Sequence, residues 1–241
     1  PVFYFPKFFH PDPTVKRKSG FLIPAFKSSS NNNENYLSIP YFHAISENKD
    51  LTLTPRFYSK DKILIQNEYR QVGATHNSIA DFSIFNEKNK NSKSHFFYNL
   101  NKNLNFDYFK ESNLKLKIQK TSNDTYLRAN KLESKIIDNA NILENSITLD
   151  LYSDDLSINA NARVFENLDR ISSDRYEFIL PEINLTKNLE NKTKLNGNFV
   201  FNSNNLIKNY DTNVFENINI NDLIFNSDPI ITKNGLYNNY E

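Results

Sequence analysis

Apolar and polar residues alternate one for one along much of this chain. The clearest runs are Leu51 to Thr54, Leu114 to Gln119 and Leu156 to Val164. Successive side chains of a β-strand point to opposite faces, so a period of two predicts strands with one apolar and one polar face. Because such runs recur over nearly the whole chain, the sequence predicts an all-β protein with many sequential strands.

Twelve strands are expected after Gly20, and a weaker one after Pro229. They fall near residues 21–27, 35–45, 50–59, 63–72, 77–86, 95–104, 112–120, 146–153, 156–165, 175–186, 193–203 and 213–220. Ser153-Asp154-Asp155 is predicted as a short turn, and residues 121–145 as a long polar connection in which Leu132–Leu143 forms a short helix. Strands in this order indicate an antiparallel up-and-down meander.

The alternation also assigns faces. The apolar face is expected to hold Leu51, Leu53, Phe57, Leu114, Leu116, Ile118, Ile147, Leu149, Leu151, Ile158, Ala160 and Val164. The polar face is expected to hold Thr52, Thr54, Arg56, Glu68, Arg70 and Arg163, with the arginines pairing to carboxylates such as Glu68 and Asp150. A soluble sandwich or β-solenoid and the lumen of a transmembrane β-barrel both fit a polar face. A meander of this length favours the barrel, because closure hides the edge strands.

Composition narrows the function classes. The chain has 241 residues, of which 38% are hydrophobic, and a net charge of +1, which gives no support to a nucleic-acid partner. No apolar run approaches the roughly 18 residues of a membrane helix, whereas a barrel strand needs only about 9 to 11. With no Cys, these residues hold no disulfide or thiolate-metal framework. With no Met and no signal peptide at its start, the chain is expected to be an internal fragment.

Enzyme chemistry finds no support in the residues. His10, His43, His76 and His95 lack metal-ligand spacing and are predicted at the surface, near strand ends or turns. There is no nucleophile-elbow motif, and the glycines are too sparse to form a phosphate-binding loop. A barrel hydrolase would need a Ser-His or Asp-His set, which we do not expect here. The sequence therefore predicts a protein that is not an enzyme and needs no cofactor.

The first nineteen residues differ from the rest. Four prolines interrupt an aromatic run that includes Phe3, Phe5 and Phe8, and the basic cluster Lys16-Arg17-Lys18 follows. Prolines at this density prevent a regular central strand. We therefore expect a domain boundary near Ser19-Gly20.

A set of short segments in a fixed order carries a family resemblance. The set is Pro1 to Pro6, Arg17 to Pro24, Leu37 to Phe42, Leu53 to Phe57, Asn67 to Arg70, Asn123 to Leu127 and Leu180 to Ile183. In this order and at this approximate spacing, the segments resemble the outer-membrane LPS-assembly protein family, LptD. The resemblance covers residues 1 to about 190, and the remainder fits by strand pattern alone.

The resemblance implies an architecture and a function. Residues 1–19 would be the last strand of a periplasmic β-jellyroll with its hinge (Lys16, Arg17, Lys18, Ser19 and Gly20), and residues 20–241 the N-terminal part of a large outer-membrane β-barrel. The implied function is lipopolysaccharide transport and assembly at the outer leaflet of the outer membrane. The implied partners are lipopolysaccharide, a plug lipoprotein and the jellyroll proteins of a periplasmic bridge. A half barrel on its own is expected to be an open curved sheet.

The resemblance also implies roles for individual residues. Pro24 and Pro40 match prolines in the first and second barrel strands of the family, where loss of one ladder hydrogen bond each would weaken a lateral gate. The residues alone leave simple bulges or bends as an alternative, since Pro55 and Pro181 lie in other predicted strands. The aromatic residues Phe3, Phe5, Phe8 and Phe21 are candidates for an acyl-chain route or for ordinary jellyroll core. Lys16, Arg17 and Lys18 suit either lipopolysaccharide phosphates or a solvated hinge.

Two other functions stay open at this point. A passive porin-type barrel would share the strand pattern but lack the hinge and the weakened first strands. A soluble β-solenoid adhesin would share the alternation but would not need detergent for extraction.

Overall fold

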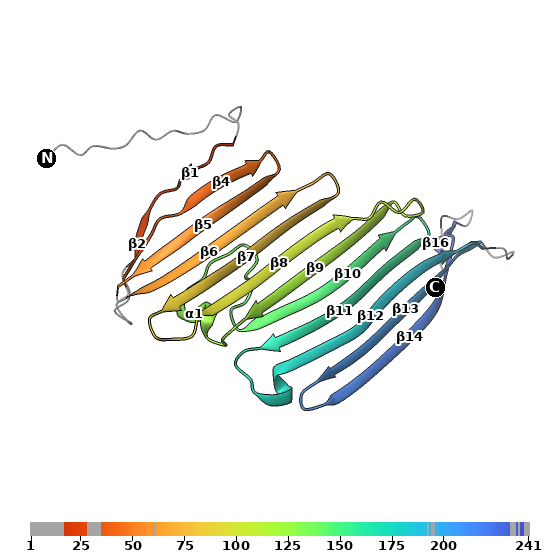
Figure 1. The fold of residues 1–241 in the computed structure, drawn as a ribbon. Coiled ribbons are helices and arrows are strands. Elements are labelled where there is room, and N and C mark those ends of the chain that lie inside the picture. Colours follow the sequence, from red (N-terminus) through yellow and green to blue (C-terminus); the bar gives the residue numbers. More distant parts are fainter. Residues whose placement is uncertain are drawn as a thin grey trace.

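A computed structural model of the chain describes residues 17–27, 35–59, 61–191, 193, 196–231, 235 and 237–238. Within these residues, 14 strands form one sheet and two short strands form a separate hairpin (Figure 1). From β4 to β14 each strand of the large sheet pairs antiparallel with its sequence neighbour. The predicted all-β up-and-down meander is confirmed.

The strands follow the alternating runs of the sequence. In chain order they are β1 (Gly20–Phe21), β2 (Ala25–Lys27), β3 (Tyr36–Ser38), β4 (Tyr41–Ser46), β5 (Lys49–Tyr58), β6 (Lys62–Val72), β7 (His76–Glu87), β8 (Lys93–Asn103), β9 (Glu111–Thr121), β10 (Ile142–Tyr152), β11 (Leu156–Asn167), β12 (Tyr176–Leu189), β13 (Gly197–Tyr210), β14 (Val214–Ser227), β15 (Ile230–Ile231) and β16 (Tyr237–Asn238). Two short helical elements, α1 (Tyr126–Ala129) and the 3₁₀ helix η1 (Ser172–Arg175), lie in connections.

The predicted strands differ from the observed ones at both ends of the sheet. The first two, predicted as residues 21–27 and 35–45, are each split, into β1 with β2 and β3 with β4. The last two, predicted as residues 193–203 and 213–220, extend to 14 residues each in β13 and β14. Asparagine is disfavoured in strands, so the Asn-rich stretches hide the continuation of these strands in the sequence.

The long connection is present between β9 and β10, but the predicted helix Leu132–Leu143 is wrong. The only helical turn there is α1, and β10 already begins at Ile142. Asn139 Oδ1 accepts hydrogen bonds from the backbone N–H groups of Asn141 (2.7 Å) and Ile142 (3.3 Å), a local turn that competes with a helix. Leu132 and Ile136 are buried in irregular chain, so their four-residue spacing reflects packing on the sheet. The short turn predicted at Ser153-Asp154-Asp155 is confirmed between β10 and β11.

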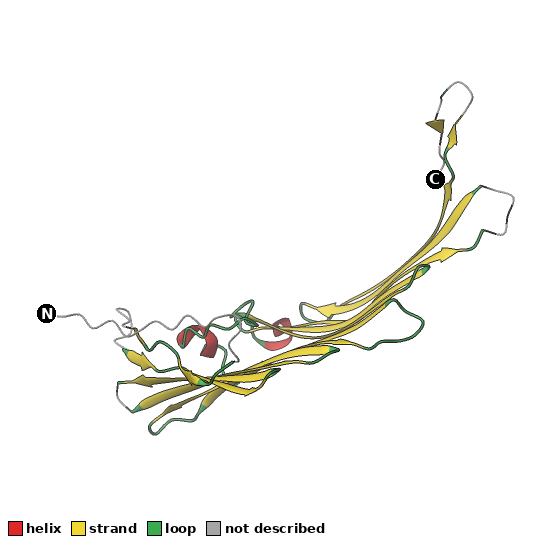
Figure 2. Cartoon of the chain, turned by 90° about the horizontal axis from the view of Figure 1, so that it is seen from above, coloured by secondary structure: helices red, strands yellow, loops and turns green. Residues whose placement is uncertain are grey.

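The large sheet is curved. Figure 2 shows it as an arched band, with α1 and its connection on the concave side. We call the concave side the inner face, the convex side the outer face, and residues 122–141 the covering segment. Within the described residues the sheet does not close, because β1 and β14 are its two ends. The expected open curved sheet is therefore confirmed.

The covering segment supplies the main buried apolar cluster. Leu64 of β6 and Phe97 of β8 are completely buried, and Tyr126, Leu127 and Ile136 of the covering segment are almost so. Burial of one such side chain contributes about 1.5 to 3 kcal/mol. These contacts hold the covering segment on the inner face.

The strand register shows which residues of each strand lie on the inner face and which on the outer face. Thr52 pairs with Glu68 and Thr54 with Gln66, and Gln66 donates a hydrogen bond to the covering segment, which places this row on the inner face. The six residues predicted to be polar and on one side, Thr52, Thr54, Arg56, Glu68, Arg70 and Arg163, all lie on the inner face. The leucine and isoleucine positions between them face outward.

The outer face changes character at β13 and β14. Ser203, Asn205, Asn219 and Asn221 lie side by side at mid-strand, where the outer rows of β9 to β11 carry aliphatic side chains. Ser203 donates to Asn221 Oδ1 (2.7 Å) and Asn205 donates to Ser203 (2.9 Å), while Asn219 donates to Asn205 and Asn221 to Asn219. This closed ring gives each polar side chain a partner, which lowers the cost of removing it from water.

Replacing Phe97 with alanine is expected to loosen the covering segment. The loss of a buried phenylalanine costs about 3 to 5 kcal/mol, so cleavage within residues 122–141 by added protease should rise more than tenfold in the folded protein. Phe96→Ala is the matched control, because Phe96 lies next in β8 on the opposite face and is 46% exposed. Equal cleavage rates in the two variants would contradict the packing described here.

Candidate functional site

At its N-terminal edge the sheet begins with two interrupted strands. We call β1 with β2 the first row, β3 with β4 the second row and β5 the third row. The first and second rows are interrupted at the same level. β1 pairs with β4 through Phe21 and Tyr41, and β2 pairs with β3 through Ala25 and Ser38. Three residues (22–24) lie between these pairs on the first row and two (39–40) on the second, so the register shifts by one residue between them. Pro24 and Pro40 both lie in this break.

The missing hydrogen bond at Pro40 faces the first row. Leu22 N–H donates to the carbonyl oxygen of Pro40 at 2.8 Å. In an antiparallel ladder a hydrogen-bonded pair exchanges two such bonds. Pro40 has no N–H to return, so one of the two bonds is absent.

Pro55 lies beside the same break, one row further into the sheet. Its carbonyl accepts a hydrogen bond from Ile39 N–H at 3.2 Å, and it too has no N–H to return. Three neighbouring rows therefore each carry a proline at one level. The sequence pattern gave no sign that Pro55 belongs with Pro24 and Pro40.

The predicted hinge is tied to the inner face by charge. Arg17 Nη1 lies 2.8 Å from Asp50 Oδ2, and Arg70 Nε lies 2.7 Å from Asp50 Oδ1. Asp50 is only 2% exposed, so two guanidinium groups neutralise a buried carboxylate. Ser19 Oγ accepts a hydrogen bond from Ala44 N–H at 2.9 Å, which fixes the chain just before Gly20 and β1. Lys18 is exposed, and Lys16 lies outside the described residues.

Of the four phenylalanines predicted to line an acyl-chain route, only Phe21 lies within the described residues. Phe3, Phe5 and Phe8 lie outside the described residues. Phe21 is 76% exposed, and its ring makes an edge contact with Tyr41 at 5.1 Å between centroids. The register Phe21 to Tyr41 to Leu53 places it on the outer face, at the free edge of the sheet.

The inner arginines are all engaged, but not all as predicted. Arg70 pairs with Glu68 at 3.5 Å as well as with Asp50, and Arg163 pairs with Glu182, so both pair with carboxylates of the inner face. Arg56 differs from the prediction: its guanidinium donates to the carbonyl oxygen of Asn130 at 2.8 Å. It therefore binds the backbone of the covering segment.

A buried polar network lies beneath the covering segment. Tyr126 OH lies 2.7 Å from Ser83 Oγ, Ser83 Oγ lies 2.6 Å from His95 Nδ1, and His95 Nε2 lies 3.1 Å from Asp81 Oδ1. Gln66 Nε2 donates to Asp81 Oδ2 at 3.0 Å and to the carbonyl of Glu133. Low local dielectric strengthens such fully paired networks.

This network corrects two expectations from the sequence. His95 is 3% exposed and lies within β8, so the prediction of a surface histidine was wrong. The structure also brings together a Ser-His-Asp set that was not expected. Ser83 is 1% exposed and capped by Tyr126, so no substrate reaches its hydroxyl in this arrangement. We interpret the set as structural. Its burial depends on Tyr126 of the covering segment, a contact 43 positions along the chain from Ser83 that strand alternation does not indicate.

Membrane-spanning helices and metal clusters are both absent from the described residues. In the part of the chain that the structure describes, no helix has the length and apolar content needed to cross a membrane. Among the same residues, no group of three or more His, Asp or Glu side chains is placed to hold a metal ion.

Fold and faces define a class of protein. A long curved antiparallel meander whose convex face is mainly apolar up to β12, and whose concave face is mainly polar, has the construction of the wall of a large outer-membrane β-barrel.

Comparison with known proteins points to one family. The chain is 32% identical over 83 residues to the LPS-assembly protein LptD of Bordetella pertussis. The matched region covers 34% of this chain and 10% of that protein. It is 44% identical over 61 residues to LptD of Paraburkholderia xenovorans (25% of this chain, 8% of that protein) and 34% identical over 93 residues to LptD of Pseudomonas putida (39% and 10%). No protein-family model matches the chain.

These similarities confirm the resemblance to the LptD family over the matched part of the chain. The chain spans about a tenth of the length of the curated relatives that it matches.

Removal of the Tyr126 hydroxyl tests the buried network. Burial raises the pKa of Tyr126 to about 12, above the ordinary value of 10.0. Its neutral form is thus favoured in the folded state, so its contribution to stability is complete below pH 10 and is lost as the pH rises through 12. Tyr126→Phe should cost about 1 kcal/mol at neutral pH and remove the highest component of the tyrosinate absorbance titration. An unchanged titration would show that Tyr126 is not the buried phenol.

Proposed function

We propose that this chain forms part of the wall of an outer-membrane β-barrel that assembles lipopolysaccharide at the outer leaflet, without an enzymatic step. The observation that carries the proposal is the similarity to several LptD proteins, whose name describes LPS assembly. The division into a polar inner and an apolar outer face supports it. In such a barrel the sugars of a glycolipid would stay on the polar side while its acyl chains meet the membrane.

The route of release is proposed at the break near Pro24 and Pro40. Each ladder hydrogen bond is worth about 0.5 to 1.5 kcal/mol net, so the loss of one between the first two rows, at Pro40, weakens this edge without abolishing it. The exposed side chains of Phe21 and Ile23 lie at the same edge. An edge that is weakly bonded and apolar on its outer side suits the sideways passage of acyl chains.

The partners and the hinge belong to the same proposal. We assign Arg17, Lys18, Ser19 and Gly20, with Lys16 before them, to the hinge between a periplasmic jellyroll and the barrel. The contact of Arg17 with Asp50, a carboxylate that Arg70 also holds, supports a fixed direction for this hinge. Jellyroll bridge proteins would deliver the lipopolysaccharide, and a plug lipoprotein would occupy the barrel.

Site-specific photocrosslinking in cells tests the release route. A probe at Phe21 in the full-length protein should form adducts with lipopolysaccharide only while the periplasmic bridge is active. A probe at Thr54, on the inner face of β5, is the control for cargo in the lumen. Adducts at Thr54 without adducts at Phe21 would overturn the exit at this edge, and adducts at neither position would favour the alternative of a passive porin-type barrel.

Pro40→Ala tests the weakened edge itself. Alanine supplies the N–H that can return a hydrogen bond to Leu22, so the edge should open about two- to tenfold less often and lipopolysaccharide should reach the cell surface more slowly. Pro55→Ala is the matched control, because its new N–H would face Ile39 and not the first row. Equal effects on the rate of surface arrival would contradict a special role for the first row.

A further inference from the structure

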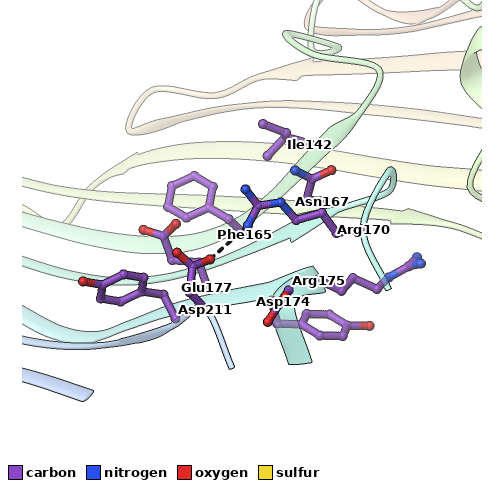
Figure 3. A pocket seen from close by; sticks show the side chains of 10 residues that line it. Ile142, Phe165, Asn167, Arg170, Asp174, Arg175, Glu177 and Asp211 are labelled. Atoms are coloured by element: carbon purple, nitrogen blue, oxygen red, sulfur yellow. Dashed lines mark hydrogen bonds and ion pairs between the residues drawn. The ribbon is translucent and has the colours of Figure 1, made fainter. Parts of the chain in front are cut away.

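A cavity of about 430 Å³ lies on the inner face near the ends of β10 to β13, beside the connections 168–175 and 211–213. Figure 3 shows side chains from these strands and connections around it. Phe165 pairs with Glu144 and Glu177 across the sheet, and Glu144 shares Lys117 with Asp138 of the covering segment. This register places Phe165 and Glu177 on the inner face. The volume falls within the range of small-molecule sites.

The lining combines apolar surface with a polar rim. Ile142, Phe165 and the ring of Tyr210 provide apolar surface. Around them, Arg170 Nη1 lies 2.9 Å from Asp211 Oδ1, and Glu177 lies 3.0 Å from Lys208 Nζ. Carboxylate and guanidinium groups that share one ion pair retain further acceptor and donor positions. The rim therefore offers both donors and acceptors to a ligand.

The charges of the lining argue against an anionic ligand. The lining has two cations, Arg170 and Arg175, and three carboxylates, Asp174, Glu177 and Asp211, and Lys208 beside Glu177 brings the cations to three, so the charges balance. Arg175 is already held by Asp124 (2.7 Å) and Glu166 (2.6 Å), and Arg170 by Asp211. A phosphate would meet no excess of positive charge and no uncommitted guanidinium. An acyl chain would leave the charged rim without water.

We propose that this cavity binds a neutral sugar. The C–H face of a pyranose ring would pack against Phe165, while its hydroxyl groups donate to Glu177 and Asp211 and accept from Arg170. The inference rests on the proposed function, because lipopolysaccharide is what would bring sugar chains to the inner face. It adds a sugar-binding site at the rim, away from the edge at Pro24 and Pro40.

Saturation-transfer NMR on the full-length protein in detergent tests the site. The probe is the oligosaccharide of the host lipopolysaccharide after removal of its acyl chains and phosphates. Wild-type protein should bind it. Glu177→Gln, which keeps the size of the side chain, and Phe165→Leu, which removes the ring but keeps the position apolar, should each weaken binding at least tenfold. Asp155→Asn is the control, because Asp155 is a paired carboxylate in the connection at the other end of β10 and β11.

The outcomes separate this site from the proposed function. No binding of the neutral oligosaccharide by wild-type protein, or equal binding by wild type and both variants, would overturn the site. Stronger binding of the phosphorylated oligosaccharide, lost in the same variants, would also overturn the assignment to a neutral sugar. Sugar binding without photocrosslinks at Phe21 would leave the site intact and reject the exit route, and the reverse result would reject the site alone.

Discussion

The antiparallel hydrogen-bond ladder is the constraint on which the rest of this structure depends. A shift of one residue in any strand moves all its side chains to the other face. From β4 to β12 the register keeps polar groups on the inner face, where Arg56, Gln66 and Gln119 meet the covering segment. The one irregularity within this span that involves a proline is at Leu180 and Pro181. It is accommodated by both neighbouring strands, so that Glu182 still faces Arg163.

The covering segment turns part of a polar face into a protein core. An inner face made only of polar side chains would bury little apolar surface. Leu64 and Phe97 are apolar residues among the polar side chains of the inner face. Tyr126, Leu127 and Ile136 of the covering segment belong to the same buried cluster. The network of Ser83, His95 and Asp81 then satisfies the polar groups that this packing removes from water. Apolar contact and hydrogen bonding therefore act on the same segment.

Much of this fold was predictable, because a period of two is a local signal. The strands from β5 to β9 and the polar set on the inner face follow from alternation alone. The packing of the covering segment did not, because it depends on contacts between Phe97 and residues some 30 positions later. His95 was misjudged for the same reason, since Tyr126 of the covering segment packs beside its ring on the inner face. In β13 and β14 the asparagines hide a strand that cross-strand amide pairing supports.

The prolines show how much of the candidate site could be identified from the sequence. The sequence indicated Pro24 and Pro40 through resemblance and left Pro55 and Pro181 as ordinary strand prolines. In the structure Pro181 lies at a bulge, where a missing N–H costs little. Pro55 instead lies beside the break that holds Pro24 and Pro40, and its missing N–H faces Ile39 of the second row. Each junction between the first three rows therefore lacks a returning hydrogen bond at one level. The missing bond at Pro40 weakens the seam between the first two rows, and the one at Pro55 lies beside it, one row further in. Only the register between distant segments reveals this alignment.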